Sequence, residues 1–255
     1  MAKQDHVTDE DLTKRHQLGK KASQKGCLTK CDCGRGRKPG NICCYLWQAG
    51  VKAKSKAGTA LYNKHPNFGN GYTSKKTHVH HDDFDHQFGP FWHNAHHIIP
   101  NGSLNSAITD AGKKLTNVIK MGLLKATYNL NDKVNMIILP MLQADAVKLG
   151  LPRHLTRDEV GPGEKQEMYS HKNYSNDVQE ELKPIMADYK KLADEAVKDA
   201  AKKHKQPNPK LTKDKLDTLS RELYEAIKAV GATAGGKSVA QKSAAIVRNL
   251  LQQRA

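Results

Sequence analysis

The chain alternates between stretches with a helical spacing of apolar residues and stretches without a clear period. Apolar residues three and four positions apart predict amphipathic helices, each of which buries one face. Ser170 is a typical N-cap residue ahead of one such helix, and Pro184 separates that helix from the next. The predicted helices cover residues 103–126 (one or two helices), 171–182, 184–203, 216–230 and 238–253.

Two short segments instead carry consecutive β-branched and apolar residues and end at a proline. The first is Ile98-Ile99-Pro100, directly after two adjacent histidines, and the second covers residues 134–140. Short apolar runs that a proline terminates are typical of strands. We therefore expect a mostly helical α+β fold, in which a small core of two strands and a helix is embedded in further helices.

The N-terminal part differs in composition from the rest of the chain. All five cysteines lie within residues 26–44, and residues 45–95 are rich in Gly, Asn, His and Lys without a clear period. We expect irregular structure in both stretches. The sequence thus divides into a basic, Cys- and His-rich segment (1–91), a core (92–185) and a C-terminal helical extension (186–255).

The chain carries a large excess of positive charge. Its 42 lysines and arginines, against 26 acidic residues, give a formal net charge of +16. Such an excess favours a polyanionic partner, because neutralising phosphates supplies affinity without sequence specificity. Nucleic acid fits this charge, as would an acidic membrane surface or an acidic protein. The longest apolar run, residues 136–142, is too short to span a bilayer, so we expect no membrane insertion.

The order of polar groups around the predicted strands indicates a metal-dependent active site. The doublet His96-His97 begins the first strand, Asn135 begins the second, and His171 begins the next helix. This is the order of a ββα-metal finger, in which one doublet histidine and the helix histidine point toward one cation. The cation acts as a Lewis acid, and a neutral imidazole can deprotonate water near neutral pH. Asn135 has no charge, so we expect it to hold the backbone of the doublet's loop.

These segments resemble a known nuclease family. Ala95-His-His-Ile-Ile-Pro100, then Asn135-Met-Ile-Ile-Leu-Pro140, then His171-Lys-Asn-Tyr174 are similar to the AHH family. This family is a branch of the HNH/endonuclease VII superfamily and is found mainly as toxin domains of bacterial competition systems. The resemblance covers roughly residues 92–185.

The resemblance implies a role for each polar group. His96 and His171 would bind one divalent metal ion, such as Mg²⁺, Ni²⁺ or Zn²⁺. His97 would be the general base, and Asn135 would orient the loop. His154 is a candidate third ligand or a phosphate contact, although residues 155–170 separate it from the helix histidine by more than is usual in the family.

The same resemblance implies a function and a setting. The protein would be a metal-dependent DNA endonuclease with little sequence specificity, and an antibacterial toxin that an acidic immunity protein neutralises. The first residues contain no apolar signal-peptide segment. We therefore expect synthesis in the bacterial cytoplasm and export into target cells by a dedicated secretion system.

The cysteines leave two interpretations open. Structural zinc takes four tetrahedral Cys or His ligands, and five neighbouring cysteines can supply these or form disulfides, with one left over in either case. If a zinc site is the working module, the protein is instead a non-catalytic zinc-binding nucleic-acid adaptor with structural histidines. The candidate zinc ligands are Cys27, Cys31, Cys33, Cys43 and Cys44.

Overall fold

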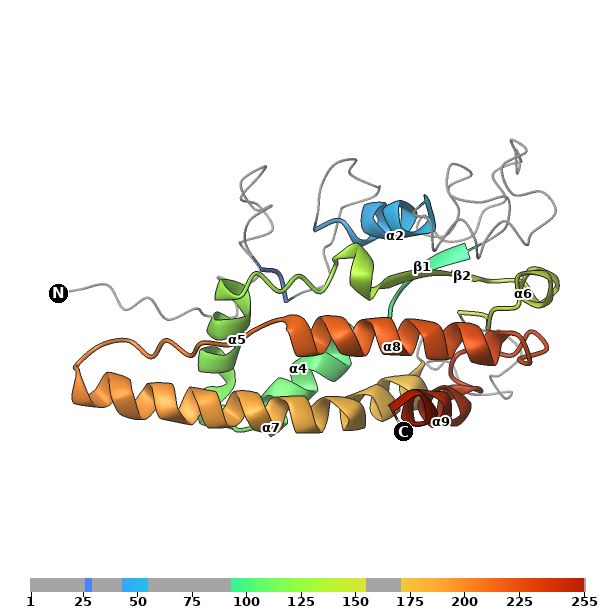
Figure 1. Cartoon of the computed structure of the whole chain (residues 1–255). Helices are drawn as coiled ribbons and strands as arrows, with labels where there is room; N and C mark the ends of the chain where they lie inside the picture. Colours follow the sequence, from blue (N-terminus) through green and yellow to red (C-terminus); the bar gives the residue numbers. More distant parts are fainter. Residues whose placement is uncertain (1–25, 29–42, 55–92, 155–170, 255) are drawn as a thin grey trace, which may run out of the picture.

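The computed structural model describes residues 26–28, 43–54, 93–154 and 171–254 (Figure 1). Within these ranges, helices predominate and a single two-stranded sheet is present, which confirms the mostly helical α+β fold. The elements are α2 (Tyr45–Lys54), β1 (His93–His97), α4 (Asn101–Asp110), η3 (Lys113–Leu115), α5 (Thr116–Lys125), η4 (Lys133–Asn135), β2 (Met136–Pro140), α6 (Gln143–Leu149), α7 (Lys172–Lys202), α8 (Asp214–Gly231) and α9 (Ser243–Arg254).

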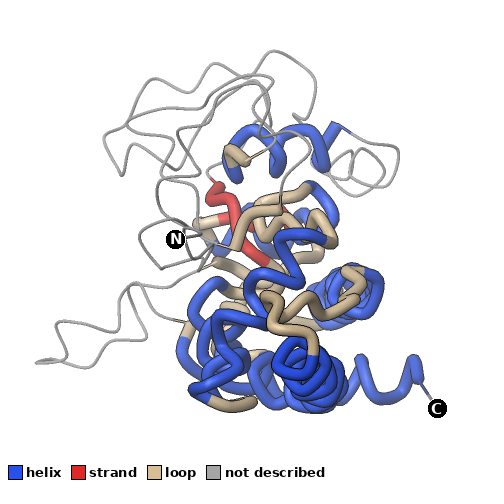
Figure 2. Tube along the Cα trace, turned by 90° about the vertical axis from the view of Figure 1, so that its left-hand side faces the viewer, coloured by secondary structure: helices blue, strands red, loops and turns tan. Residues whose placement is uncertain are grey.

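The two strands form an antiparallel pair between helices. His93 pairs with Pro140 and His97 with Met136. Helix α2 packs on one side of the sheet, and α8 runs along the other side above α7 (Figures 1 and 2). Because successive side chains of a strand point to opposite faces, neighbouring residues of β1 reach two different environments.

The strand boundaries differ from the sequence prediction. The doublet lies at the end of β1 and not at a strand start, because the polar segment from His93 to His97 pairs with β2. Asn135 ends the 3-10 turn η4, and β2 begins one residue later. All five residues of β2 are buried. The polar, His-rich β1 is therefore extended because it pairs with the apolar strand β2. The sequence pattern of β1 alone does not indicate a strand.

Two predictions about helices were wrong. The segment from Tyr45 to Lys54 is helical, where irregular structure was expected, because buried Tyr45 and Ala49 pack into the core beside the sheet. The two helices predicted on either side of Pro184 form the single 31-residue helix α7. Pro184 is exposed, whereas the apolar stripe of α7 is buried, so packing on one face holds the helix across the missing N–H.

Glycines and one isolated bridge set other helix limits. The apolar period over residues 103–126 is divided into α4 and α5 around Gly112, whose φ of 150° suits glycine. Helix α6 ends at Gly150, which adopts the left-handed conformation. The last helix begins at Ser243, later than expected, because Ser238 pairs with Arg153 in an isolated bridge.

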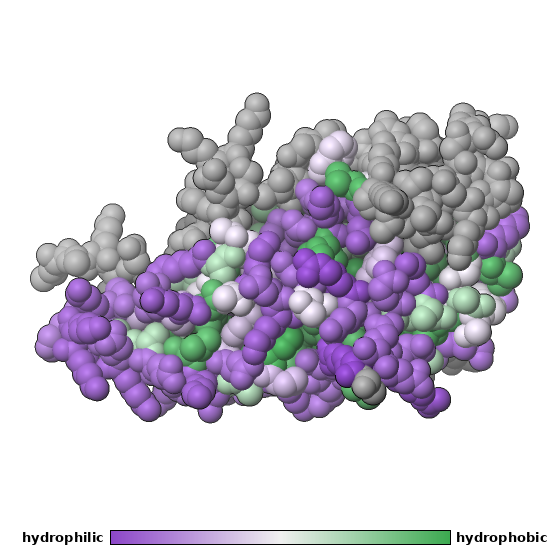
Figure 3. All heavy atoms as spheres, in the orientation of Figure 1, coloured by the Kyte–Doolittle hydropathy of each residue, from purple (hydrophilic) through white to green (hydrophobic). Residues whose placement is uncertain are grey.

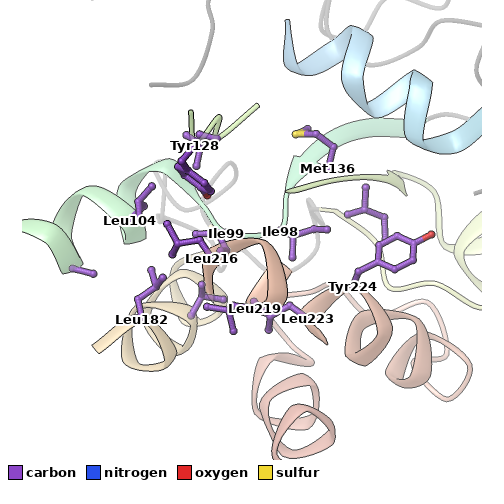
Figure 4. Packing of buried hydrophobic residues seen from close by; sticks show 14 of the residues in the cluster. Ile98, Ile99, Leu104, Tyr128, Met136, Leu182, Leu216, Leu219, Leu223 and Tyr224 are labelled. Atoms are coloured by element: carbon purple, nitrogen blue, oxygen red, sulfur yellow. The ribbon is translucent and has the colours of Figure 1, made fainter. Parts of the chain in front are cut away.

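The core lies directly beneath the loop that follows β1. Ile98 and Ile99 are fully buried among side chains of α4, α7 and α8 (Figure 4). One hydrophobic cluster includes residues from α2 through α9, so segments far apart in sequence hold this loop. The division into residues 1–91, 92–185 and 186–255 stays a prediction, and α7 runs across its second boundary.

On the face shown in Figure 3, the described residues are mostly hydrophilic, with small separate apolar areas. Among the described residues, no helix is long and apolar enough to cross a membrane.

Candidate active site

Three histidines from separate parts of the chain meet at one point. The ligand atoms of His96, His154 and His171 all lie within 4.8 Å of one another. Their ring centroids are 4.7 to 5.1 Å apart. Within the described part of the chain, this His triad is the one group of His, Cys, Asp or Glu close enough to hold a metal ion.

Each member of the His triad is positioned by a different backbone element. His96 is the fourth residue of β1. His154 follows α6, and its N–H donates to the carbonyl of Pro140 at 2.9 Å, which ties it to the end of β2. His171 precedes α7, and its carbonyl accepts from Ser175 N–H at 2.8 Å in the first helical turn. The sheet and the start of α7 therefore bring together residues that are up to 75 positions apart in sequence.

Burial favours the neutral, ligating form of His96. This side chain is 1% exposed, and its Nε2 has no hydrogen-bond partner among the described residues. Burial, and then the nearby imidazoles of His171 and His154, lower the pKa of His96 well below its ordinary value. A buried nitrogen without a partner is unfavourable, and a metal ion would satisfy it. The donor set of imidazoles suits Zn²⁺, Ni²⁺ and related ions.

Tyr174 supports the loop beside the His triad. Its ring centroid lies 5.3 Å from that of His96, and its hydroxyl donates to the carbonyl of Ile98 at 2.6 Å. Complete burial raises the pKa of this hydroxyl, so it stays protonated and remains a donor.

His97 points to the opposite side of the sheet. Its ring centroid lies 5.3 Å from that of Tyr45 in α2, and Nε2 lies 2.9 Å from Oδ1 of Asn131. His97 is 8% exposed. The alternation of the strand therefore gives the two adjacent histidines different surroundings, one within the His triad and one beside a neutral amide.

Asn135 joins the two strand-end loops through its buried side chain. Its Oδ1 accepts from Ile99 N–H at 2.7 Å and from Ser220 Oγ at 3.0 Å. Its Nδ2 donates to the carbonyls of Leu130, at 2.8 Å, and Ile99, at 3.2 Å. These are the backbone contacts expected of an uncharged side chain at this position, and the link to α8 is an addition that the sequence did not indicate.

Three of the five cysteines belong to the described residues and lie on the α2 side of the sheet. Cys27, Cys43 and Cys44 are buried in one small cluster, against which the partly buried Leu46 and Trp47 pack. These three residues do not by themselves meet the distances of a metal-ligand group. Cys31 and Cys33 lie outside the described residues, as does most of the His-rich stretch before the doublet. The choice between zinc and disulfides therefore stays a prediction.

Two lysines lie over the ring of Tyr224 where α2, η4 and α8 meet, and two further cations lie near one of them. Nζ of Lys52 lies 4.2 Å from the centroid of this ring, and Nζ of Lys228 lies 5.2 Å from it. Burial lowers the pKa of Lys52, Glu225 opposes this effect, and the positive charges of the neighbouring cations add to it. The four members of this Tyr224 cation cluster are Lys52, Lys133, Arg221 and Lys228.

Two residues near the site make contacts that the sequence pattern did not predict. Asn131 belongs to an Asn-Asp pair that only indicated a turn, and Tyr174 was part of a motif without a stated role. Both contacts join residues more than 30 positions apart, so no local pattern signals them.

A comparison with known protein families identifies the family of this chain. The profile of AHH, a nuclease family of the HNH/ENDO VII superfamily with conserved AHH, matches residues 77–223. The match extends beyond residues 92–185 on both sides and includes Ser220, which bonds to Asn135. No curated protein and no solved structure gives a significant match. Because the profile spans more than half of the chain, this protein belongs to the AHH family of nucleases.

Proposed function

We propose that the protein is a metal-dependent DNA endonuclease that hydrolyses phosphodiester bonds with little sequence specificity. The observation that carries this proposal is the His triad, together with His97, which occupies the next position of β1 and is held separately. Three imidazoles suited to one metal ion and an adjacent imidazole suited to proton transfer are what metal-assisted hydrolysis requires.

The donor set supports a divalent ion as the cofactor. His96, His154 and His171 would hold it through their ring nitrogens. When bound, the ion supplies Lewis-acid stabilisation of negative charge on the phosphate and the leaving oxygen. Nuclease superfamily membership and the buried Nε2 of His96 both favour this assignment.

The chain's own residues perform the remaining steps. His97 accepts a proton from the attacking water, and the resulting hydroxide attacks the phosphorus while the bond to the leaving oxygen breaks. Asn135 and Tyr174 keep the backbone of Ile98 and Ile99 in place, which fixes the strand end that carries both histidines. Lys52, Lys133 and Arg221 of the Tyr224 cation cluster offer positive charge to the phosphate backbone, whereas Lys228 forms an ion pair with Glu225.

A plasmid cleavage assay across several divalent ions tests this function. We expect the wild type to cleave with at least one ion and EDTA to stop the reaction. His97→Ala should lower the rate by about 10² to 10⁴, the usual contribution of a general base, while metal binding persists. His97→Ala cleaving at the wild-type rate would contradict the assignment.

The same assay addresses the adaptor alternative. A wild type that binds nucleic acid but cleaves with none of the ions would favour a non-catalytic zinc-binding adaptor. In that case, chelation should affect binding or folding through the cysteines, and substitution of the His triad should not change nucleic-acid binding.

The proposed biological role is that of an antibacterial toxin. The net charge of +16 suits both DNA and an acidic immunity protein, and export by a dedicated secretion system would deliver the enzyme to target cells. Production inside a bacterium should be lethal for the wild type and tolerated for His97→Ala. A small acidic protein encoded beside the gene should suppress this lethality. Equal growth with both variants would contradict the toxin role.

A further inference from the structure

The buried side-chain amide of Asn131 contacts the proposed general base, His97. Nε2 of His97 and Oδ1 of Asn131 are 2.9 Å apart, and the Asn131 side chain is completely buried. The two residues are 34 positions apart in sequence, so this contact is a product of the fold. Asn131 belongs to the turn before η4, and neither the AHH motif nor the strand pattern includes it.

In the structure, the nitrogen of this amide points away from His97, toward Cys27. Nδ2 of Asn131 donates to Sγ of Cys27 at 3.5 Å, and Asn131 N–H donates to Oδ1 of Asn129 at 3.0 Å. Cys27 is itself held by backbone bonds of 2.7 Å with Tyr128 and Leu130. With the amide nitrogen at the sulfur, the amide oxygen faces the imidazole.

This orientation determines the proton position on His97. An amide oxygen is only an acceptor, so the hydrogen bond requires a proton on Nε2. The lone pair of the neutral imidazole then lies on Nδ1. In histidine sites generally, the partner of one ring nitrogen determines which nitrogen is available for chemistry.

We propose that Asn131 is a positioning residue for the general base, and that it holds His97 in the tautomer whose Nδ1 accepts the proton from water. This inference rests on the proposed nuclease function for its kinetic consequence. Asn131 acts through His97, so it should affect kcat and leave KM nearly unchanged. Cys27 takes part in the site through its contact with this amide.

Two substitutions of similar size separate positioning from packing. Asn131→Leu removes the acceptor, and we expect kcat to fall about 10- to 100-fold, the usual effect of losing such a partner. Asn131→Asp retains an acceptor at the same place, and we expect it to recover most of the lost kcat. Both variants should leave KM and metal binding by the His triad close to wild type.

Tyr128→Phe is the matched control for disturbing this part of the core. Tyr128 is fully buried three residues before Asn131, and its hydroxyl has no hydrogen-bond partner among the described residues. We expect wild-type kcat from this variant. Equal kcat for Asn131→Leu and wild type would overturn the proposal, as would equal losses in the Leu and Asp variants.

Imidazole ¹⁵N NMR of the metal-free protein gives a readout that does not depend on activity. Wild-type His97 should show a protonated Nε2 and an unprotonated Nδ1, and Asn131→Leu should shift this balance. The opposite tautomer in the wild type would overturn the proposal even if no variant could be folded. An inactive wild type with the expected tautomer would count against the nuclease function and leave this assignment supported.

Discussion

At the residue scale, two adjacent histidines have separate surroundings because they lie on a strand. His96 is nearly fully buried among two other imidazoles, while His97 faces α2 and a neutral amide. If β1 paired with β2 one residue out of register, His96 and His97 would exchange these environments. The buried contacts of Asn135 and Tyr174 hold this register by fixing the backbone at Ile98 and Ile99.

Asn135→Ala should destabilise the fold strongly. The substitution removes four hydrogen bonds from Ile99, Leu130 and Ser220. A buried polar group left without a partner costs about 1–3 kcal/mol, so we expect the free energy of unfolding to fall by at least ~3 kcal/mol. Urea denaturation measures this free energy.

Asn105→Ala is the control, because it loses only local hydrogen bonds to Asn101. Its free energy of unfolding should fall by less than ~1 kcal/mol, and a similar decrease in both variants would refute the role of Asn135.

The part of His154 in metal binding can be measured through stability. A ligand that binds only the folded state raises stability by RT ln(1 + [L]/Kd), so a suitable divalent ion should raise the Tm of the wild type. His154→Ala and His171→Ala should each reduce this rise, because each removes one of three nitrogens. His204→Ala, at an exposed position after α7, is the control. An unchanged rise for His154→Ala would remove this residue from the ligand set.

At the element scale, tertiary packing overrides local signals. Pro184 predicts a helix break, yet α7 continues through it because buried side chains on either side, such as Leu182 and Met186, anchor one face to the core. Helix α2 has no acidic residue in its first turn and lies in a stretch without a clear period, and it forms against the sheet. A short stretch of sequence shows only the intrinsic helix propensity of its residues. These helices are stabilised instead by packing against segments that are distant in sequence.

Pro184→Ala should stabilise the protein. Pro184 is exposed inside α7 and cannot donate a hydrogen bond to the preceding turn. Alanine is about 3 kcal/mol more favourable in a helix interior, and the greater freedom of the unfolded chain offsets about 0.4–1 kcal/mol. Since the helix already accommodates proline, we expect the free energy of unfolding, measured by urea denaturation, to rise by about 1–2 kcal/mol.

Lys191→Ala, also exposed in α7, is the control and should change the free energy of unfolding by under ~0.5 kcal/mol. A loss in the proline variant would mean that the ring makes favourable contacts.

At the scale of the whole molecule, the excess positive charge has a local concentration near the site. The Tyr224 cation cluster joins α2, η4 and α8. Tyr45, beside His97, begins α2, and Lys52 lies seven residues later, about 10 Å along the helix axis. That length corresponds to about three nucleotide steps of one DNA strand. A strand held at His97 could therefore reach the cluster.

Neutralising three members of this cluster should weaken DNA binding and reduce its salt dependence. In a His97→Ala background, the triple change Lys52→Gln, Lys133→Gln and Arg221→Gln should lower the slope of log K against log salt by about 0.9 for each phosphate that the protein no longer neutralises. Fluorescence anisotropy with duplex DNA measures this.

A matched triple variant on α7 serves as the control. The exposed Lys190, Lys191 and Lys202 lie toward the end of α7 that is remote from His171, and their change to glutamine removes the same charge. An equal decrease in slope for both triple variants would show that only net charge matters.

The fold class, the nuclease family and the order of the polar groups follow from the amino-acid sequence alone. They depend on residue types and short-range spacing, which a chain displays without folding: an apolar period, two proline-ended runs, and histidines and an asparagine in a recognisable order. Which of these groups meet depends instead on tertiary packing. His154 approaches His171 because its backbone is tied to Pro140, and Asn131 reaches His97 across 34 positions. Such contacts arise from strand pairing and burial against distant helices, and no local pattern encodes them.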